Sequence, residues 1–99
     1  MSEQELAIDV VENAAANRFE ATVNGELAVA EYVRTGNTVT FTHTLVPEAL
    51  RNRGIGSALA RAALERATER GWRVVPRCPF IAAYIAQHPE YHALAETVA

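Results

Sequence analysis

The hydrophobic pattern of the chain changes its period once, near Pro47, and this change limits the fold more than any other feature. Before Pro47, apolar and polar residues alternate, most clearly over residues 38–45, as they do in a half-buried strand. The strand over 38–45 is predicted to carry four side chains on one face, Val39, Phe41, His43 and Leu45. After Pro47, apolar residues recur every three or four positions from Ile55 to Ala67, which indicates a helix that Gly71 ends.

The remaining elements follow from turn and breaker residues. Strands are predicted over residues 6–11, 19–23, 27–34, 38–45 and 72–78, with helices over 55–70 and from 79 to the stop at Pro89. The helix between the last two strands makes those strands parallel, with a right-handed crossover. Pro76 cannot donate to a ladder, so the fifth strand is expected to lack a partner on one side near its end. We expect an α/β (α+β) fold with a mixed, mostly antiparallel sheet of about five strands and two main helices, forming a single domain over residues 1–99.

Composition excludes several classes of protein. The chain has 99 residues, 49% of them hydrophobic and 21% charged, which is typical of one compact domain. No segment approaches the ~18 consecutive apolar residues of a spanning helix, and the first residues are acidic, so we expect a cytoplasmic protein without membrane contact. The net charge of −3 argues against nucleic acid as a partner. Cys78 is the only cysteine, so neither an internal disulfide nor a metal site is expected.

A glycine-containing segment between the clearest strand and the clearest helix is suited to bind phosphate. It consists of Arg51, Asn52, Arg53, Gly54, Ile55, Gly56 and Ser57. Glycines let the backbone approach a ligand, the first N–H groups of a helix are unpaired donors, and arginines add charge-assisted bonds. At ordinary residue usage this pattern occurs by chance in roughly one chain of this length in ten, so its place between strand and helix carries the prediction. The alternative is a glycine-rich helix start with solvated arginines. The residues that a mononucleotide P-loop and a dinucleotide fingerprint require are absent.

The stretch from Phe41 to Tyr91 resembles a small, single-domain branch of the GCN5-related N-acetyltransferase (GNAT) superfamily. The likeness is most specific at His43-Thr44-x-Val46, Arg51-x-x-Gly54-x-Gly56 and Cys78-Pro-Phe. The resemblance implies acetyl-CoA as the cofactor, with Arg51, Gly54 and Gly56 and the N–H groups of residues 53–57 at its pyrophosphate. It also implies that Leu45 and Val46 pair with the amides of the pantetheine arm, in a gap where the last two strands splay apart.

Three residues are candidates for catalysis. Cys78 ends the fifth strand beside the expected thioester, where arginines and a helix start favour a nucleophilic thiolate; alternatively, it is a buried structural thiol. His43 is placed to deprotonate an incoming amine, or else it is a core histidine bonded to backbone. By resemblance, Tyr84 protonates the departing CoA thiolate, although its spacing with Phe80 and His88 also suits a core residue.

The acceptor is less defined than the cofactor. Larger GNAT enzymes place two helices between strands one and two, whereas only residues 14–17 are available here. We expect transfer of an acetyl group from acetyl-CoA to an amine on a small molecule, peptide or protein. The alternatives are a non-catalytic CoA or acyl-CoA sensor and a structural or dimerising domain, and a homodimer is left open.

Overall fold

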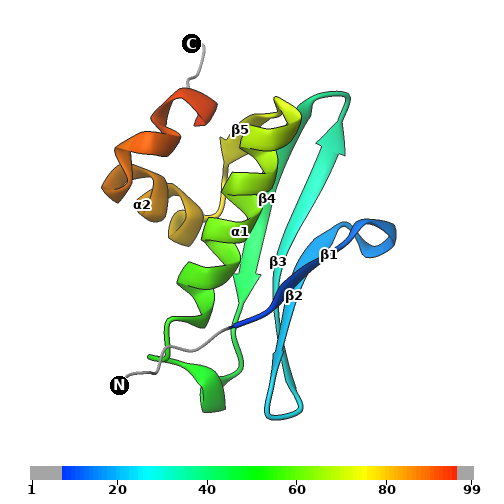
Figure 1. Cartoon of the computed structure of the whole chain (residues 1–99), viewed down its shortest axis with the longest axis vertical. Helices are drawn as coiled ribbons and strands as arrows, with labels where there is room; N and C mark the ends of the chain where they lie inside the picture. The colour runs from blue at the N-terminus through cyan, green and yellow to red at the C-terminus, as the bar shows by residue number, and fades with distance from the viewer. Residues whose placement is uncertain (1–7, 96–99) are drawn as a thin grey trace.

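Five strands form one mixed sheet in the computed structural model, which describes residues 8–95 (Figure 1). The strands are β1 (Val10–Asn13), β2 (Arg18–Val23), β3 (Glu26–Thr35), β4 (Thr38–Leu45) and β5 (Arg73–Pro76). They lie in sequence order across the sheet, with antiparallel pairing from β1 to β4 and a parallel pair of β4 and β5. The predicted mixed, mostly antiparallel sheet is therefore confirmed. Residues 6 and 7 of the predicted first strand lie outside the described residues, and β1 extends to Asn13.

Two α-helices and three short 3₁₀ helices complete the structure. The α-helices are α1 (Ile55–Arg70) and α2 (Pro79–Gln87), and the 3₁₀ helices are η1 (Ala14–Ala16), η2 (Glu48–Leu50) and η3 (Pro89–Ala95). Gly71 ends α1 in the left-handed region (φ 69°), and its N–H bonds the carbonyls of Ala67 and Thr68. Pro89 ends the second helix as predicted but also begins η3. No helix within residues 8–95 combines the length and apolar composition needed to cross a membrane.

The helices cover one face of the sheet, and the core lies between them. In Figure 1, α1 lies across the sheet and α2 lies beside it, next to the β5 edge. An aromatic cluster of Phe19, Tyr32, Phe41 and Trp72 fills the covered face, with ring centroids 5.6 to 6.5 Å apart. Buried alanines of α1 let the helix approach the sheet closely.

A β-bulge in β4 divides that strand into two parts. Tyr32 of β3 pairs with Phe41, whereas Glu31 pairs with His43, so Thr42 is an extra residue in β4. Because successive side chains in a strand alternate between faces, the extra residue reverses the alternation from that point on. The second part of β4 therefore turns Thr44 toward the covered face and His43 toward the open one. This reversal decides which side chains reach the site described below.

Candidate functional site

The start of α1 offers unpaired backbone donors. Gly54 precedes the helix in the left-handed region (φ 77°), and Asn52 has a positive φ of 66° in the same turn. No side chain caps this end of the helix, and the N–H of Ala58 makes the first bond of the helix, to the carbonyl of Gly54. The N–H groups of residues 55–57 consequently have no partner within the helix, at the end where the helix dipole is positive.

A hollow of about 400 Å³ lies in front of these donors. Its lining comes from the end of β4, the loop, the first turn of α1 and the start of α2: Val46, Leu50, Arg51, Asn52, Gly54, Ile55, Gly56, Ser57 and Phe80. Arg51 and Arg53 are exposed beside it, and the Nε of Arg51 donates to the Val46 carbonyl at 3.4 Å. The first turn of α1 carries no acidic residue. Positive charge and free N–H groups thus face a space that an anion can enter.

Gly56 packs against the Phe80 ring, which would have to shift to admit a side chain at this position. A Cβ added at Gly56 would lie 3.0 Å from Cζ and 3.3 Å from Cε2 of the Phe80 ring, which is closer than ordinary contact. The absence of a side chain lets the ring close one wall of the hollow. The same glycine therefore serves helix packing and the shape of the candidate site.

The parallel strands β4 and β5 separate beside this hollow. Their pairing ends at Phe41 and Pro76, whereas β4 continues to Leu45. Cys78 lies where the strands part: its N–H donates to the Phe41 carbonyl at 2.9 Å, and its Sγ is 3.4 Å from Oγ1 of Thr44. The thiol is only 3% exposed and stands at the N-cap of α2. The pairing with β4 thus ends where Pro76 predicts the strand to lose a partner, and the chain turns into α2 at Pro79.

His43 does not lie on the face expected for it. The sequence predicts His43 and Leu45 on the face of Phe41, but the bulge at Thr42 reverses the alternation, so this prediction is wrong. The His43 side chain is 65% exposed, with Nδ1 3.9 Å from Oε1 of Glu31, and Leu45 is 52% exposed. His43 is thus turned away from Cys78, and Thr44 takes the place beside the thiol.

Tyr84 lies between α2 and α1, half-buried. Its ring stacks on His88 with centroids 3.9 Å apart, and Nδ1 of His88 is 2.7 Å from the Tyr84 carbonyl. Burial raises the pKa of the Tyr84 phenol, while the nearby Arg61 guanidinium opposes that shift. The phenol therefore carries its proton at neutral pH and can act as a donor.

The structure gathers the predicted phosphate-loop residues around one hollow but separates the three predicted catalytic residues. Cys78 contacts Thr44, His43 contacts Glu31 and Tyr84 contacts His88. Sequence reasoning missed Thr44 and Phe80 as neighbours of the site. Thr44 belongs to the His43-Thr44-x-Val46 stretch and Phe80 to the Cys78-Pro-Phe stretch, but nothing in the sequence marks the contact of Phe80 with Gly56. Within residues 8–95, no three His, Cys, Asp or Glu side chains are grouped to hold a metal ion.

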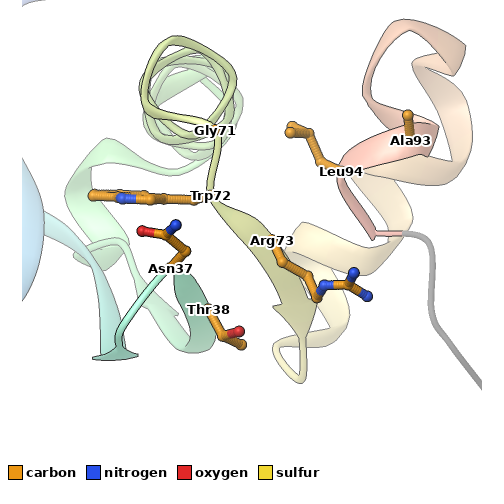
Figure 2. A pocket seen from close by; sticks show the side chains of 7 residues that line it. All are labelled: Asn37, Thr38, Gly71, Trp72, Arg73, Ala93 and Leu94. Carbon is orange, nitrogen blue, oxygen red and sulfur yellow. The ribbon is translucent and has the colours of Figure 1, made fainter.

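A second hollow of about 420 Å³ lies at the other end of α1, lined by Asn37, Thr38, Gly71, Trp72, Arg73, Ala93 and Leu94 (Figure 2). Figure 2 shows the Trp72 ring beneath Gly71 and Leu94 extending from η3 toward them. This is the carbonyl end of the helix, where the dipole is negative and Arg70 in the last turn compensates it. The backbone donors suited to a phosphate are therefore at the Arg51–Ser57 hollow and not here.

Comparisons with known proteins agree on one family. The sequence model described as GCN5-related N-acetyl-transferase matches residues 18–94. Protein NATD1 of Xenopus tropicalis is 36% identical over 75 residues, covering 73% of this chain and 69% of that protein. Protein NATD1 of Homo sapiens is 33% identical over 90 residues, covering 88% and 80%.

The fold has a counterpart among solved structures. The solution NMR structure of a GCN5-like protein from Staphylococcus aureus superposes with a TM-score of 0.71 at 22% identity. The match covers 93% of this chain and 91% of that one, so almost every described element has an equivalent. With most of its length matched by the family model and by relatives above 30% identity, the chain belongs to the GCN5-related N-acetyltransferase family.

Proposed function

We propose that the protein transfers an acetyl group from acetyl-CoA to an amine. The observation that carries this proposal is the uncapped start of α1, whose free N–H groups and flanking arginines face a hollow beside the gap between β4 and β5. A pyrophosphate is an anion that such a helix start binds well. Membership of the family supports the same assignment, since the resemblance in sequence implies a cofactor bound at this loop.

The residues of the site fit such a ligand. The N–H groups of residues 53–57 and the side chains of Arg51 and Arg53 would hold the pyrophosphate, and Asn52 and Gly54 shape the turn that aims them. The backbone of Leu45 and Val46, beyond the end of the β4–β5 pairing, would bond the amides of the pantetheine arm. When bound there, acetyl-CoA supplies an activated acetyl thioester. The protein contributes mainly positioning and electrostatics.

The protein's own proton donors and acceptors allow direct transfer. His43 is exposed and lies beside Glu31, so it can take a proton from an amine that reaches the open side of the gap. Tyr84 carries its proton at neutral pH, as an ordinary phenol does, and it is the donor proposed for the leaving thiolate. His43→Ala should lower kcat with little effect on acetyl-CoA affinity. An unchanged kcat would remove His43 from the mechanism.

A second route uses Cys78 as the first acetyl acceptor. The thiol lies where β4 and β5 part, beside the Thr44 hydroxyl, which is a suitable place for a nucleophile to meet a thioester. Intact-protein mass spectrometry after incubation with acetyl-CoA tests this route. A gain of one acetyl group in the wild type that is lost in Cys78→Ala supports it, whereas full transfer activity of Cys78→Ala rules it out.

Acetyl-CoA titration calorimetry tests the binding half of the proposal. Arg51→Ala should weaken binding about tenfold, or ~1.4 kcal/mol, because one charge-assisted contact to phosphate is lost. Arg73→Ala, at the opposite end of α1, is the matched control and should bind as the wild type does. Release of free CoA thiol with a panel of amines and peptides then tests turnover. Failure of acetyl-CoA to bind at all would refute the proposal.

One observation favours a second function, a sensor that binds CoA or acyl-CoA without turnover. The connection between β1 and β2 contains only the three-residue η1, so no helix from this connection covers the open face of the sheet or builds an acceptor wall there. Tight acetyl-CoA binding without thiol release for any amine in the panel would favour the sensor over the enzyme.

A further inference from the structure

Phe80 differs from the other exposed apolar side chains in its position. Six large apolar residues within residues 8–95 are strongly exposed; five of them belong to strands, and the sixth, Phe80, belongs to α2. A single exposed apolar residue is common on a protein surface. Phe80, however, is 41% exposed and lines the hollow at Arg51–Ser57. A ligand in that hollow therefore meets an aromatic ring that water now contacts.

The ring lies next to the backbone donors of α1. Its Cζ atom would be only 3.0 Å from a Cβ added at Gly56. The N–H of Gly56 is one of the donors at the start of α1, where the first bond of the helix is made by Ala58 and no side chain caps the end. A phosphate held by these donors would thus have the Phe80 ring beside it.

Phe80 supplies most of the apolar surface that a ligand in the hollow can touch. Leu50 and Ile55 also line the hollow, but each is only 2% exposed. Val46 is half-buried at the end of β4. The hollow therefore combines donors for an anion with one exposed ring, which suits a ligand that carries an apolar group directly next to its phosphate.

The ring also lies between the start of α1 and the gap between β4 and β5. Phe80 follows Cys78 by two residues, and the N–H of Cys78 donates to the Phe41 carbonyl at 2.9 Å where the two strands part. A ligand that extends from the helix start into the gap passes this ring. In CoA, the pantetheine arm leaves the pyrophosphate through a methylene group and a carbon that bears a gem-dimethyl group, before its first amide.

We propose that the Phe80 ring packs against the gem-dimethyl group of the pantetheine arm, an inference that rests on the proposed function. The contact buries apolar surface of both partners, and it selects for a pyrophosphate that is followed by an apolar group. Phe80 is then a specificity-determining residue for the cofactor, whereas the N–H groups of α1 bind any suitable phosphate.

Calorimetric titration with two ligands tests this contact. Acetyl-CoA carries the pantetheine arm, whereas adenosine 3′-phosphate 5′-diphosphate keeps the pyrophosphate and lacks the arm. Phe80→Ala should weaken acetyl-CoA binding about tenfold, because the apolar contact is lost, and should change binding of the shorter ligand by less than about twofold. Phe80→Leu, which keeps an apolar side chain, should lose less acetyl-CoA affinity than Phe80→Ala.

Leu27→Ala is the matched control, because Leu27 is also 41% exposed but lies on β3 and does not line the hollow. This variant should bind both ligands as the wild type does, and circular dichroism should show all three variants folded. If Phe80→Ala does not fold, the selective loss of acetyl-CoA affinity in Phe80→Leu decides the test.

Two results would overturn the role of Phe80 and leave the proposed function in place. One is an unchanged acetyl-CoA affinity in both Phe80 variants, and the other is an equal loss for the two ligands, which would mean that the ring acts only on the shape of the loop. A wild type that binds neither ligand would instead overturn the proposed function together with this contact.

Discussion

Gly56 contacts the Phe80 ring of α2 and also lines the candidate binding hollow. Adding one methyl group at this position should change ligand affinity much more than stability. In Gly56→Ala the Cβ meets the Phe80 ring, which is 41% exposed and can move into the hollow. We expect stability to change by no more than about 1 kcal/mol, because the ring can yield and alanine favours a helix. Acetyl-CoA affinity should fall about tenfold, since the displaced ring occupies ligand space.

The double variant Gly56→Ala, Phe80→Ala provides the control for that prediction. With the ring removed, the new methyl group has nothing to displace, so the methyl group should no longer reduce affinity relative to Phe80→Ala alone. Calorimetric titration of acetyl-CoA into the wild type, the two single variants and the double variant gives the coupling free energy between the two substitutions. Equal losses with and without the ring would mean that Gly56 acts through its backbone and not through Phe80.

Tyr91 should make stability depend on alkaline pH. Burial, together with the nearby Glu65 carboxylate, raises the pKa of its phenol from 10.0 to about 12. The unfolded state loses its proton first, so the stabilisation is complete below pH 10 and is lost as pH rises toward 12. Between pH 9 and pH 11 this one group should remove about 1.4 kcal/mol from the free energy of unfolding.

Urea denaturation at pH 9 and pH 11 measures this loss of stability. Between these two pH values, the free energy of unfolding should fall less in Tyr91→Phe than in the wild type. The pKa values of Tyr32 and Tyr84 are also raised by burial, so part of the alkaline loss should persist in the variant. Identical losses in the two proteins would show that Tyr91 has an ordinary pKa in the folded state.

At the scale of elements, β1 is a four-residue edge strand that one carboxylate ties to α1. Glu12, whose side chain is 9% exposed, accepts bonds from Arg66 at 3.1 Å, Arg70 at 3.2 Å and the Tyr32 hydroxyl at 3.1 Å. Glu12→Gln should cost about 2 kcal/mol of stability, below the usual cost of breaking a buried pair because both arginines still reach water. Urea denaturation measures the change.

Glu69→Gln is the control for that substitution. Glu69 also pairs with Arg66, at 3.2 Å, but its side chain is 68% exposed, so the cost should stay within about 0.5 kcal/mol. Faster hydrogen exchange confined to β1 amides in Glu12→Gln would locate the effect in that strand. Equal costs for the two substitutions would contradict the role given to Glu12.

How much of the fold could be predicted from sequence is clear in β3 and β4. Alternation predicted both strands, but it could not say which face a helix covers. Leu27 is more apolar than Ala28, yet Leu27 is 41% exposed and Ala28 is fully buried, because α1 packs closely on the small residue. The bulge at Thr42 left no sequence signal, so the face of His43 was mispredicted. The turn that leads into α1 at Ile55 was predictable because its glycines and its place between strand and helix are both local features. Phosphate binding at this turn stays a prediction.

For the whole molecule, the one-sided arrangement of helices separates two surfaces. The hollow at Arg51–Ser57 lies on the helix side, whereas Val33 lies on the open face. Acetyl-CoA at 100 times its Kd should add ~2.7 kcal/mol to the free energy of unfolding and raise Tm by about 10 °C or more in a domain of this size. Wild type and Val33→Glu should show the same shift in differential scanning calorimetry, because Val33 does not line the hollow. A smaller shift in Val33→Glu alone would mean that the two surfaces are energetically coupled through the sheet, and no shift in either protein would contradict the proposed cofactor.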